Sequence, residues 1–125
     1  MNGIVLDAGG LIARERNDRR ASLLLDAAVE DGIHIIIPAT ALAQVFRNPA
    51  RQARLLRLLG AEETEVVPLD EAAARNVGEL LAHSGTSDIT DAHVVICAQH
   101  SDYTVITSDP SDIERLDPAL AVIPV

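Results

Sequence analysis

Four aspartates stand where apolar segments would normally exclude a charge. Asp7 and Asp109 each follow a short apolar run at a distance of one or two residues. Asp91 lies at the start of an almost wholly apolar stretch, with Asp88 three positions before it. Ionised carboxylates that converge in such surroundings require a compensating charge. Because carboxylate oxygens suit hard cations, the pattern indicates a site for Mg²⁺ or Mn²⁺.

A site of this kind is suited to hydrolysis of a phosphodiester bond. A bound divalent cation lowers the pKa of water and neutralises charge on the phosphoryl and leaving oxygens, so no covalent nucleophile is required. Each aspartate also has a structural alternative. Asp88 and Asp91 could serve a helix N-terminus, Asp7 could cap a turn, and Asp109 precedes Pro110 as turn residues often do. The interpretation as a metal site depends on their joint placement.

The elements that must position these aspartates alternate between strand and helix. Strands are expected at residues 3–6, 34–37, 65–68, 104–107 and 121–125. Helices are expected at residues 18–31, 38–48, 50–59, 70–84, 87–100 and 110–116. Gly9 and Gly10 are interpreted as a tight turn, and Pro124 indicates an edge strand. The pattern predicts an α/β fold, a three-layer α/β/α sandwich with a mostly parallel sheet of about five strands. Ligands bind such sheets at the carboxyl ends of the strands.

Length and composition restrict the class of protein. The 125 residues, 48% of them hydrophobic, are expected to form one domain over residues 1–125. Neither a secretory signal nor a membrane span is recognisable, so we expect a cytoplasmic protein with no membrane partner. The single cysteine, Cys97, excludes an internal disulfide and a cysteine-rich zinc site. All ten basic residues are arginine, which excludes P-loop and phosphoreceiver chemistry that needs lysine.

The segments around three of the aspartates resemble the signature stretches of PIN-domain ribonucleases. They are residues 4–12, 91–98 and 105–109. In length and layout the chain is most similar to the VapC-like toxins of bacterial toxin–antitoxin pairs. The resemblance implies a Mg²⁺- or Mn²⁺-dependent endoribonuclease that is often a homodimer and is held inactive by a small antitoxin. It carries the metal-site role onto Asp7, Asp91 and Asp109.

One departure from the family pattern concerns charge. Where the family usually has a glutamate, this chain has Gln44, which keeps an oxygen ligand without its charge. The site could therefore be weakened, or Asp88 could compensate. The alternative function is a PIN-like domain that no longer cuts and binds RNA or protein instead. Asp112 and Thr107 are possible secondary members of the site. The family also often has Ser or Thr shortly after the first aspartate, where this chain has glycines.

The charge balance leaves room for an RNA substrate on one part of the surface. The net charge is −9, but residues 1–60 hold eight arginines against six acids, whereas residues 61–125 hold two against thirteen. Arginine binds phosphate without reading sequence. With only one Phe and one Tyr in the chain, base stacking is not the main mode of recognition. The arginines expected to contact the RNA backbone are Arg14, Arg16, Arg19 and Arg20.

Overall fold

The five strands form one parallel sheet in the order β3-β2-β1-β4-β5. The structure is a computed structural model that describes residues 2–125. The strands are β1 Gly3–Leu6, β2 His34–Pro38, β3 Thr64–Val67, β4 Thr104–Thr107 and β5 Val122–Pro124. The helices are α1 Ala8–Glu15, α2 Arg19–Glu30, α3 Ala39–Val45, α4 Ala53–Leu59, α5 Glu71–Ser84, α6 Ile89–Ser101 and α7 Pro110–Leu116, with a 3₁₀ helix η1 at Pro49–Arg51.

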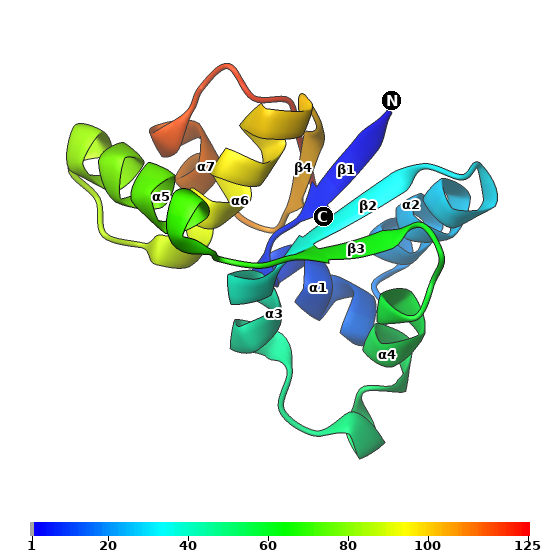
Figure 1. Cartoon of the computed structure of the whole chain (residues 1–125). Helices are drawn as coiled ribbons and strands as arrows, with labels where there is room; N and C mark the ends of the chain where they lie inside the picture. The colour runs from blue at the N-terminus through cyan, green and yellow to red at the C-terminus, as the bar shows by residue number, and fades with distance from the viewer. Residues whose placement is uncertain (1) are drawn as a thin grey trace.

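Helices cover both faces of the sheet (Figure 1). Helices α5, α6 and α7 lie on one side and α1, α2 and α4 on the other, while α3 lies near the carboxyl end of β2. The predicted three-layer α/β/α sandwich is therefore confirmed. Strand β5, which contains Pro124, is an edge strand as its proline indicated. Within residues 2–125, no helix has both the length and the apolar content needed to cross a membrane.

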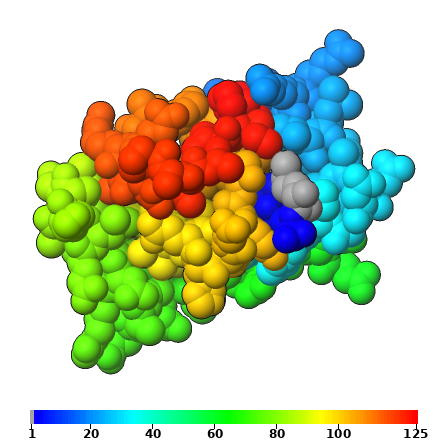
Figure 2. Space-filling model, turned by 90° about the horizontal axis from the view of Figure 1, so that it is seen from above, coloured from blue at the N-terminus to red at the C-terminus, as the bar shows by residue number. Residues whose placement is uncertain are grey.

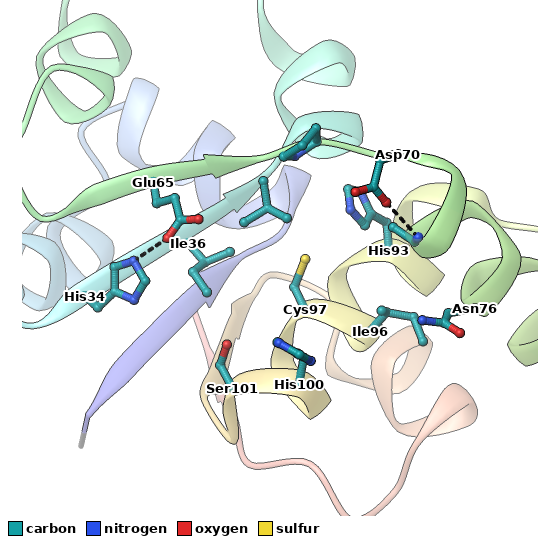
Figure 3. A pocket seen from close by; sticks show the side chains of 13 residues that line it. His34, Ile36, Glu65, Asp70, Asn76, His93, Ile96, Cys97, His100 and Ser101 are labelled. Atoms are coloured by element: carbon teal, nitrogen blue, oxygen red, sulfur yellow. Dashed lines mark hydrogen bonds and ion pairs between the residues drawn. The ribbon is translucent and has the colours of Figure 1, made fainter.

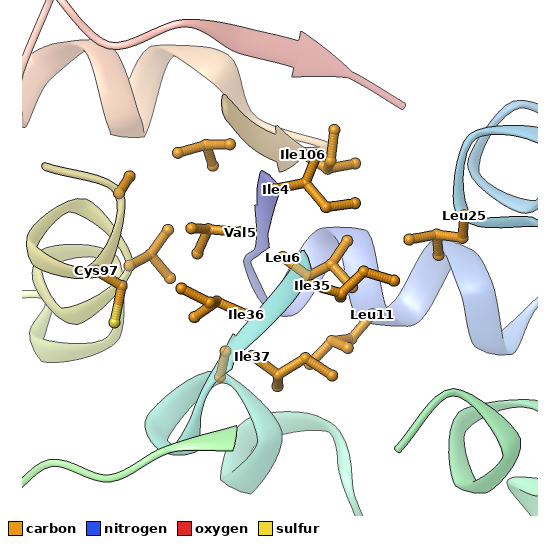
Figure 4. Close-up of a cluster of buried hydrophobic side chains, with 14 of the residues drawn as sticks. Ile4, Val5, Leu6, Leu11, Leu25, Ile35, Ile36, Ile37, Cys97 and Ile106 are labelled. Atoms are coloured by element: carbon orange, nitrogen blue, oxygen red, sulfur yellow. The ribbon is translucent and has the colours of Figure 1, made fainter. Parts of the chain in front are cut away.

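The central strands read as unbroken apolar runs because both of their faces are buried. In β1, Val5 points toward α6, whereas Leu6 points toward α1 on the opposite face (Figure 4). In β2, Ile36 shares the α6 side and Ile35 shares the α1 side. All four side chains are at least 96% buried. Burial of this kind stabilises a domain by roughly 25 cal/mol per Å² of apolar surface, and it holds the ends of β1 and β4 in fixed positions.

The pair Gly9 and Gly10 lies inside helix α1, so the predicted tight turn is wrong. Asp7 is the N-cap of this helix, and its Oδ1 accepts a hydrogen bond from the Gly10 amide at 2.7 Å. A Cβ on Gly10 would lie only 2.8 Å from the Ile106 carbonyl oxygen. The glycines therefore let α1 pack closely against β4. The sequence pattern predicted that the two glycines reverse the chain, whereas they allow a helix to pack against a strand.

The helix predicted for residues 50–59 is divided in two. Gln52 separates η1 from α4 and is 4% exposed. Its side chain accepts hydrogen bonds from the amides of Arg47 and Asn48 at 2.9 and 3.1 Å. It also donates to the Val45 carbonyl oxygen at 2.8 Å. These bonds satisfy the backbone between α3 and α4, and they stabilise an irregular connection where the apolar pattern predicted a continuous helix.

We expect Gly10→Ala to lower the free energy of unfolding by about 1–3 kcal/mol, because the new methyl group would force α1 away from the Ile106 backbone. Gly78 is the matched control, since it is also helical and a Cβ there would meet nothing within 4 Å. Gly78→Ala should raise stability by roughly 0.5–1 kcal/mol. Urea unfolding of the three proteins measures both effects. Equal changes in the two variants would contradict the packing role of Gly10.

Candidate functional site

The aspartates meet at the carboxyl edge of the sheet, where the strand order reverses. Strand β1 pairs with β2 on one side and with β4 on the other. Asp7 follows β1 directly, and Asp109 comes two residues after β4. Asp91 enters the same region from the first turn of α6. This boundary between the two halves of a parallel sheet is where open α/β folds bind their ligands.

Asp7 is the most buried carboxylate of the group, with 7% of its surface exposed. Burial raises its pKa, while hydrogen bonds from the Thr107 side chain and the Gly10 amide oppose the rise. Thr107 is itself fully buried. Asp7 thus caps helix α1 rather than the turn that its structural alternative predicted, and it also faces the site. The two roles use the same side chain.

Asp91 is at the centre of the acidic cluster. Burial raises its pKa from 3.8 to about 6, and the charges of Asp88, Asp112, Asp7 and Asp109 add to the rise. The structure therefore brings the four aspartates of the sequence hypothesis into one electrostatic neighbourhood. Asp88 is exposed and caps α6, with its Oδ1 accepting from the Asp91 amide at 2.9 Å. Its capping role does not remove its charge from the site.

Asp109 and Asp112 both lie at the start of α7, and each affects the pKa of the other. The Asp109 carboxylate accepts a hydrogen bond from the Ser111 hydroxyl at 2.7 Å, and this bond is the main reason that its pKa is lowered. Burial, followed by the charge of Asp109, raises the pKa of Asp112. The Asp109 amide donates to Thr107 Oγ1 at 2.9 Å. Thr107 therefore links the loops that carry Asp7 and Asp109.

A hydroxyl group occupies the place left open by Gly9. A Cβ built on Gly9 would collide with Ser108 Oγ. The sequence lacks the hydroxyl residue shortly after Asp7 that the family it resembles often has, and the Ser108 hydroxyl from the β4–α7 loop lies in that space. Sequence reasoning missed Ser108. Its signal was the polar side chain directly before Asp109.

Gln44 lies exposed on α3, one helical turn after Thr40. Thr40 Oγ1 is hydrogen-bonded to His93 Nδ1 at 2.8 Å, and His93 follows Asp91 by two residues on α6. Helix α3 is thereby held beside the helix that carries Asp91. A contribution of the uncharged Gln44 amide to the site stays a prediction.

The donor chemistry of the cluster fits a hard divalent cation. All of its ionisable members are carboxylates. Burial, and after it their mutual repulsion, raises the pKa of Asp91, so a bound cation would offset unfavourable charge. The side chains are not preorganised for metal binding. Within residues 2–125, no group of three His, Cys, Asp or Glu side chains is arranged to hold a metal ion. Binding would require the carboxylates to turn inward.

The arginines expected to contact RNA have different surroundings. Arg14 forms an ion pair with Asp26 at 3.3 Å, and its side chain is only 16% exposed. Arg16 lines a cavity of about 380 Å³ together with Gly9, Ser108 and Asp18. Arg19 and Arg20 are exposed at the start of α2. Their contact with RNA stays a prediction.

Sequence reasoning also missed Arg115, the arginine that shares a cavity with the acidic cluster. Arg115 lines a cavity of about 370 Å³ with Asp88, Asp91 and Asp112. The signal in the sequence was the three-residue spacing between Asp112 and Arg115, which places both on one face of α7.

Another cavity, of about 490 Å³, lies between β2, β3, α5 and α6 (Figure 3). His34 in its wall is hydrogen-bonded to Tyr103 OH and Glu65 Oε1, both at 2.9 Å. Burial raises the pKa of Cys97 to about 11, with a further contribution from Glu65, so its thiol stays protonated. The cavity lies away from Asp7 and Asp109, which do not line it.

Comparison with known proteins identifies one family. The PIN domain model matches residues 4–117. No curated protein shows significant sequence similarity to the chain. Among solved structures, a chain of VapBC2 from Rickettsia felis, bound to a fragment of its promoter DNA, is 17% identical with a TM-score of 0.74, covering 98% of both chains.

Two further structures are similar over nearly the whole chain. DNA-bound VapBC from Salmonella typhimurium is 19% identical with a TM-score of 0.70, covering 99% of this chain and 98% of that one. VapBC-5 from Mycobacterium tuberculosis, a member of the VapBC family of toxin–antitoxin systems, is 26% identical with a TM-score of 0.56, covering 100% and 98%.

Proposed function

This chain belongs to the PIN domain family, and from that premise we propose that it is a metal-dependent endoribonuclease, the toxin of a VapC-like toxin–antitoxin pair. The observation that carries the proposal is the group of carboxylates around Asp91 at the point where strand order reverses. Like charges held together destabilise the fold, so the helix-capping roles of Asp7 and Asp88 do not by themselves explain why the carboxylates are gathered here.

In this proposal Asp7, Asp91 and Asp109 hold Mg²⁺ or Mn²⁺, and Asp88 replaces the charge that Gln44 lacks. The cation supplies a more acidic water and neutralises charge on the phosphodiester. The protein's own contribution is positional. Asp7 is fixed by its bond to the α1 amide and by Thr107, and Asp91 by the first turn of α6. Asp112 does not contact the cation in this proposal and acts through the charge of Asp109 beside it.

The same proposal assigns the partners. RNA is the substrate, and a protein antitoxin covers the acidic cleft, most simply with a basic side chain that replaces the cation's charge. The similar structures that carry the VapBC name support an antitoxin partner. A homodimer in the cytoplasm completes the proposed assembly.

Gln44 favours a second candidate function. With an uncharged amide in place of the family's glutamate, the domain could bind RNA or a protein without cutting. Asp88 decides between the two functions. If its charge suffices, the cluster holds its cation; if Asp88 acts only as a helix cap, the site is short of one charge.

We expect purified protein to cut structured RNA with Mg²⁺ or Mn²⁺ and to stop when a chelator is added. Gel analysis of end-labelled RNA measures this, with Gln44→Glu tested in parallel. If wild type cuts, the glutamate variant should cut at a similar or higher rate, because it adds one anionic ligand. A silent wild type and an active Gln44→Glu variant would establish the non-cutting alternative. Silence of both would contradict the nuclease proposal.

A further inference from the structure

Arg115 is placed to neutralise a negative charge beside the acidic cluster. It lies in the last turn of α7 and lines the 370 Å³ cavity that Asp88 and Asp91 also line. The cavity is of a size that holds small ligands. A cation in this position stays close to whatever the aspartates hold.

The side chain of Arg115 is not committed elsewhere. Within residues 2–125 it forms no ion pair, whereas Arg14 pairs with Asp26 and Arg75 pairs with Glu71. Its charge acts to lower the pKa of Asp112, three residues earlier on α7. An exposed guanidinium in this setting can turn toward a ligand and bind it through two hydrogen bonds.

A second arginine lies on the other side of the site. Arg16 lines the cavity that contains Gly9 and Ser108, which are close in sequence to Asp7 and Asp109. Arg115 lines the cavity that contains Asp91. One cavity thus joins Arg16 to the chain neighbours of Asp7 and Asp109 and also contains Asp18, whereas the other joins Arg115 to Asp91 itself. Figure 2 shows the opposite edge of the molecule from above, where the start of the chain (blue) lies beside α6 and the C-terminal segment (yellow to red).

We infer that Arg115 binds a phosphate of single-stranded RNA next to the bond that is cut, and that the strand passes from Arg16 across the acids to Arg115. The inference rests on the proposed nuclease function. Two small cavities on either side of a cluster suit an extended strand whose phosphates are spaced along it. A duplex presents a wide, regular surface that does not enter such cavities.

A purely structural role for Arg115 is the competing explanation. In that role its charge offsets Asp112 and affects folding alone. The two roles differ in their response to salt. Loss of one phosphate contact reduces the slope of log Kd against log salt concentration by about 0.7 for a single strand, whereas loss of an internal counterion leaves this slope unchanged.

The test compares Arg115→Gln, Arg115→Lys and the control Arg75→Gln, an exposed arginine on α5 paired with Glu71 at 3.0 Å. Each variant is also made in an Asp91→Asn background, so that binding is measured without cleavage. The probe is a fluorescein-labelled pool of random single-stranded RNA, titrated by fluorescence anisotropy at several salt concentrations with Mg²⁺ present. Melting temperatures of all variants are recorded.

Arg115→Gln should weaken binding about tenfold at low salt, reduce the salt slope by about 0.7, and raise KM more than it lowers kcat. Arg115→Lys should restore the slope, and Arg75→Gln should match its parent. Equal slopes for Arg115→Gln and Arg75→Gln, or no RNA binding by any protein, would overturn the inference. If wild type cuts RNA and Arg115→Gln binds and cuts as wild type does, this inference is wrong but the nuclease proposal stands. If wild type does not cut RNA and Arg115→Gln still reduces the salt slope of binding, the RNA site stands and the nuclease proposal is wrong.

Discussion

Asp91→Asn should strongly reduce RNA cleavage and, at the same time, make the metal-free protein more stable at pH 7. The charge on Asp91 is unfavourable in the folded state, because burial and four neighbouring carboxylates raise its pKa from 3.8 to about 6. A shift of this size sets an upper limit of about 3 kcal/mol. Since Asp91 is only half-buried, solvent screening reduces the expected gain to about 1–2 kcal/mol.

Two measurements on the same samples test this expectation. Cleavage should fall by about 10²–10³, because the variant loses several kcal/mol of charge stabilisation. Thermal unfolding with chelator at pH 7 should shift upward by several degrees. Asp31→Asn is the control, as Asp31 is an exposed aspartate at the end of α2. Retained activity would remove Asp91 from the site, and a fall in stability would show that its carboxylate serves the fold.

The group of carboxylates could be predicted from the sequence because its aspartates stand beside apolar segments, where a charge is unfavourable. Asp7 and Asp109 interrupt apolar surroundings at strand ends, and parallel strands end at one edge of a sheet. That reasoning required only the alternation of strands and helices. The helix N-terminus of α6 could be found in the same way, because Asp88 stands three residues before Asp91.

Features that depend on distant contacts could not be predicted. The close approach of α1 to β4 explains Gly9 and Gly10, and it involves the Ile106 carbonyl almost a hundred residues later. Arg14 and Arg115 show the same limit. Spacing placed Arg14 near Asp7 in the chain, but the fold turns it to Asp26, while Arg115 reaches the acids from α7.

The metal-free protein should lose stability as the pH rises from about 4 to 6, and Mg²⁺ should restore it at pH 7. The pKa of Asp91 is about 6 when folded and close to 3.8 when unfolded, so between these values the folded state binds the proton more tightly. Stability therefore falls as the pH rises through this window. Asp7 and Asp112, whose pKa values are also raised by burial, act in the same direction, and Asp109, whose pKa is lowered, acts against them.

Melting temperatures at pH 5 and pH 7, with and without Mg²⁺, measure both parts of this prediction, with NaCl of equal ionic strength as control. At a Mg²⁺ concentration one hundred times Kd, the gain at pH 7 should be about 2.7 kcal/mol. At pH 5 it should be smaller, because the cation must first displace the proton from Asp91. Asp91→Asn should show little gain at either pH. If Mg²⁺ stabilises the protein equally at both pH values, or still stabilises Asp91→Asn, the cation binds somewhere other than this cluster. Only a cation that competes with the proton on Asp91 makes the stabilisation depend on both pH and this residue.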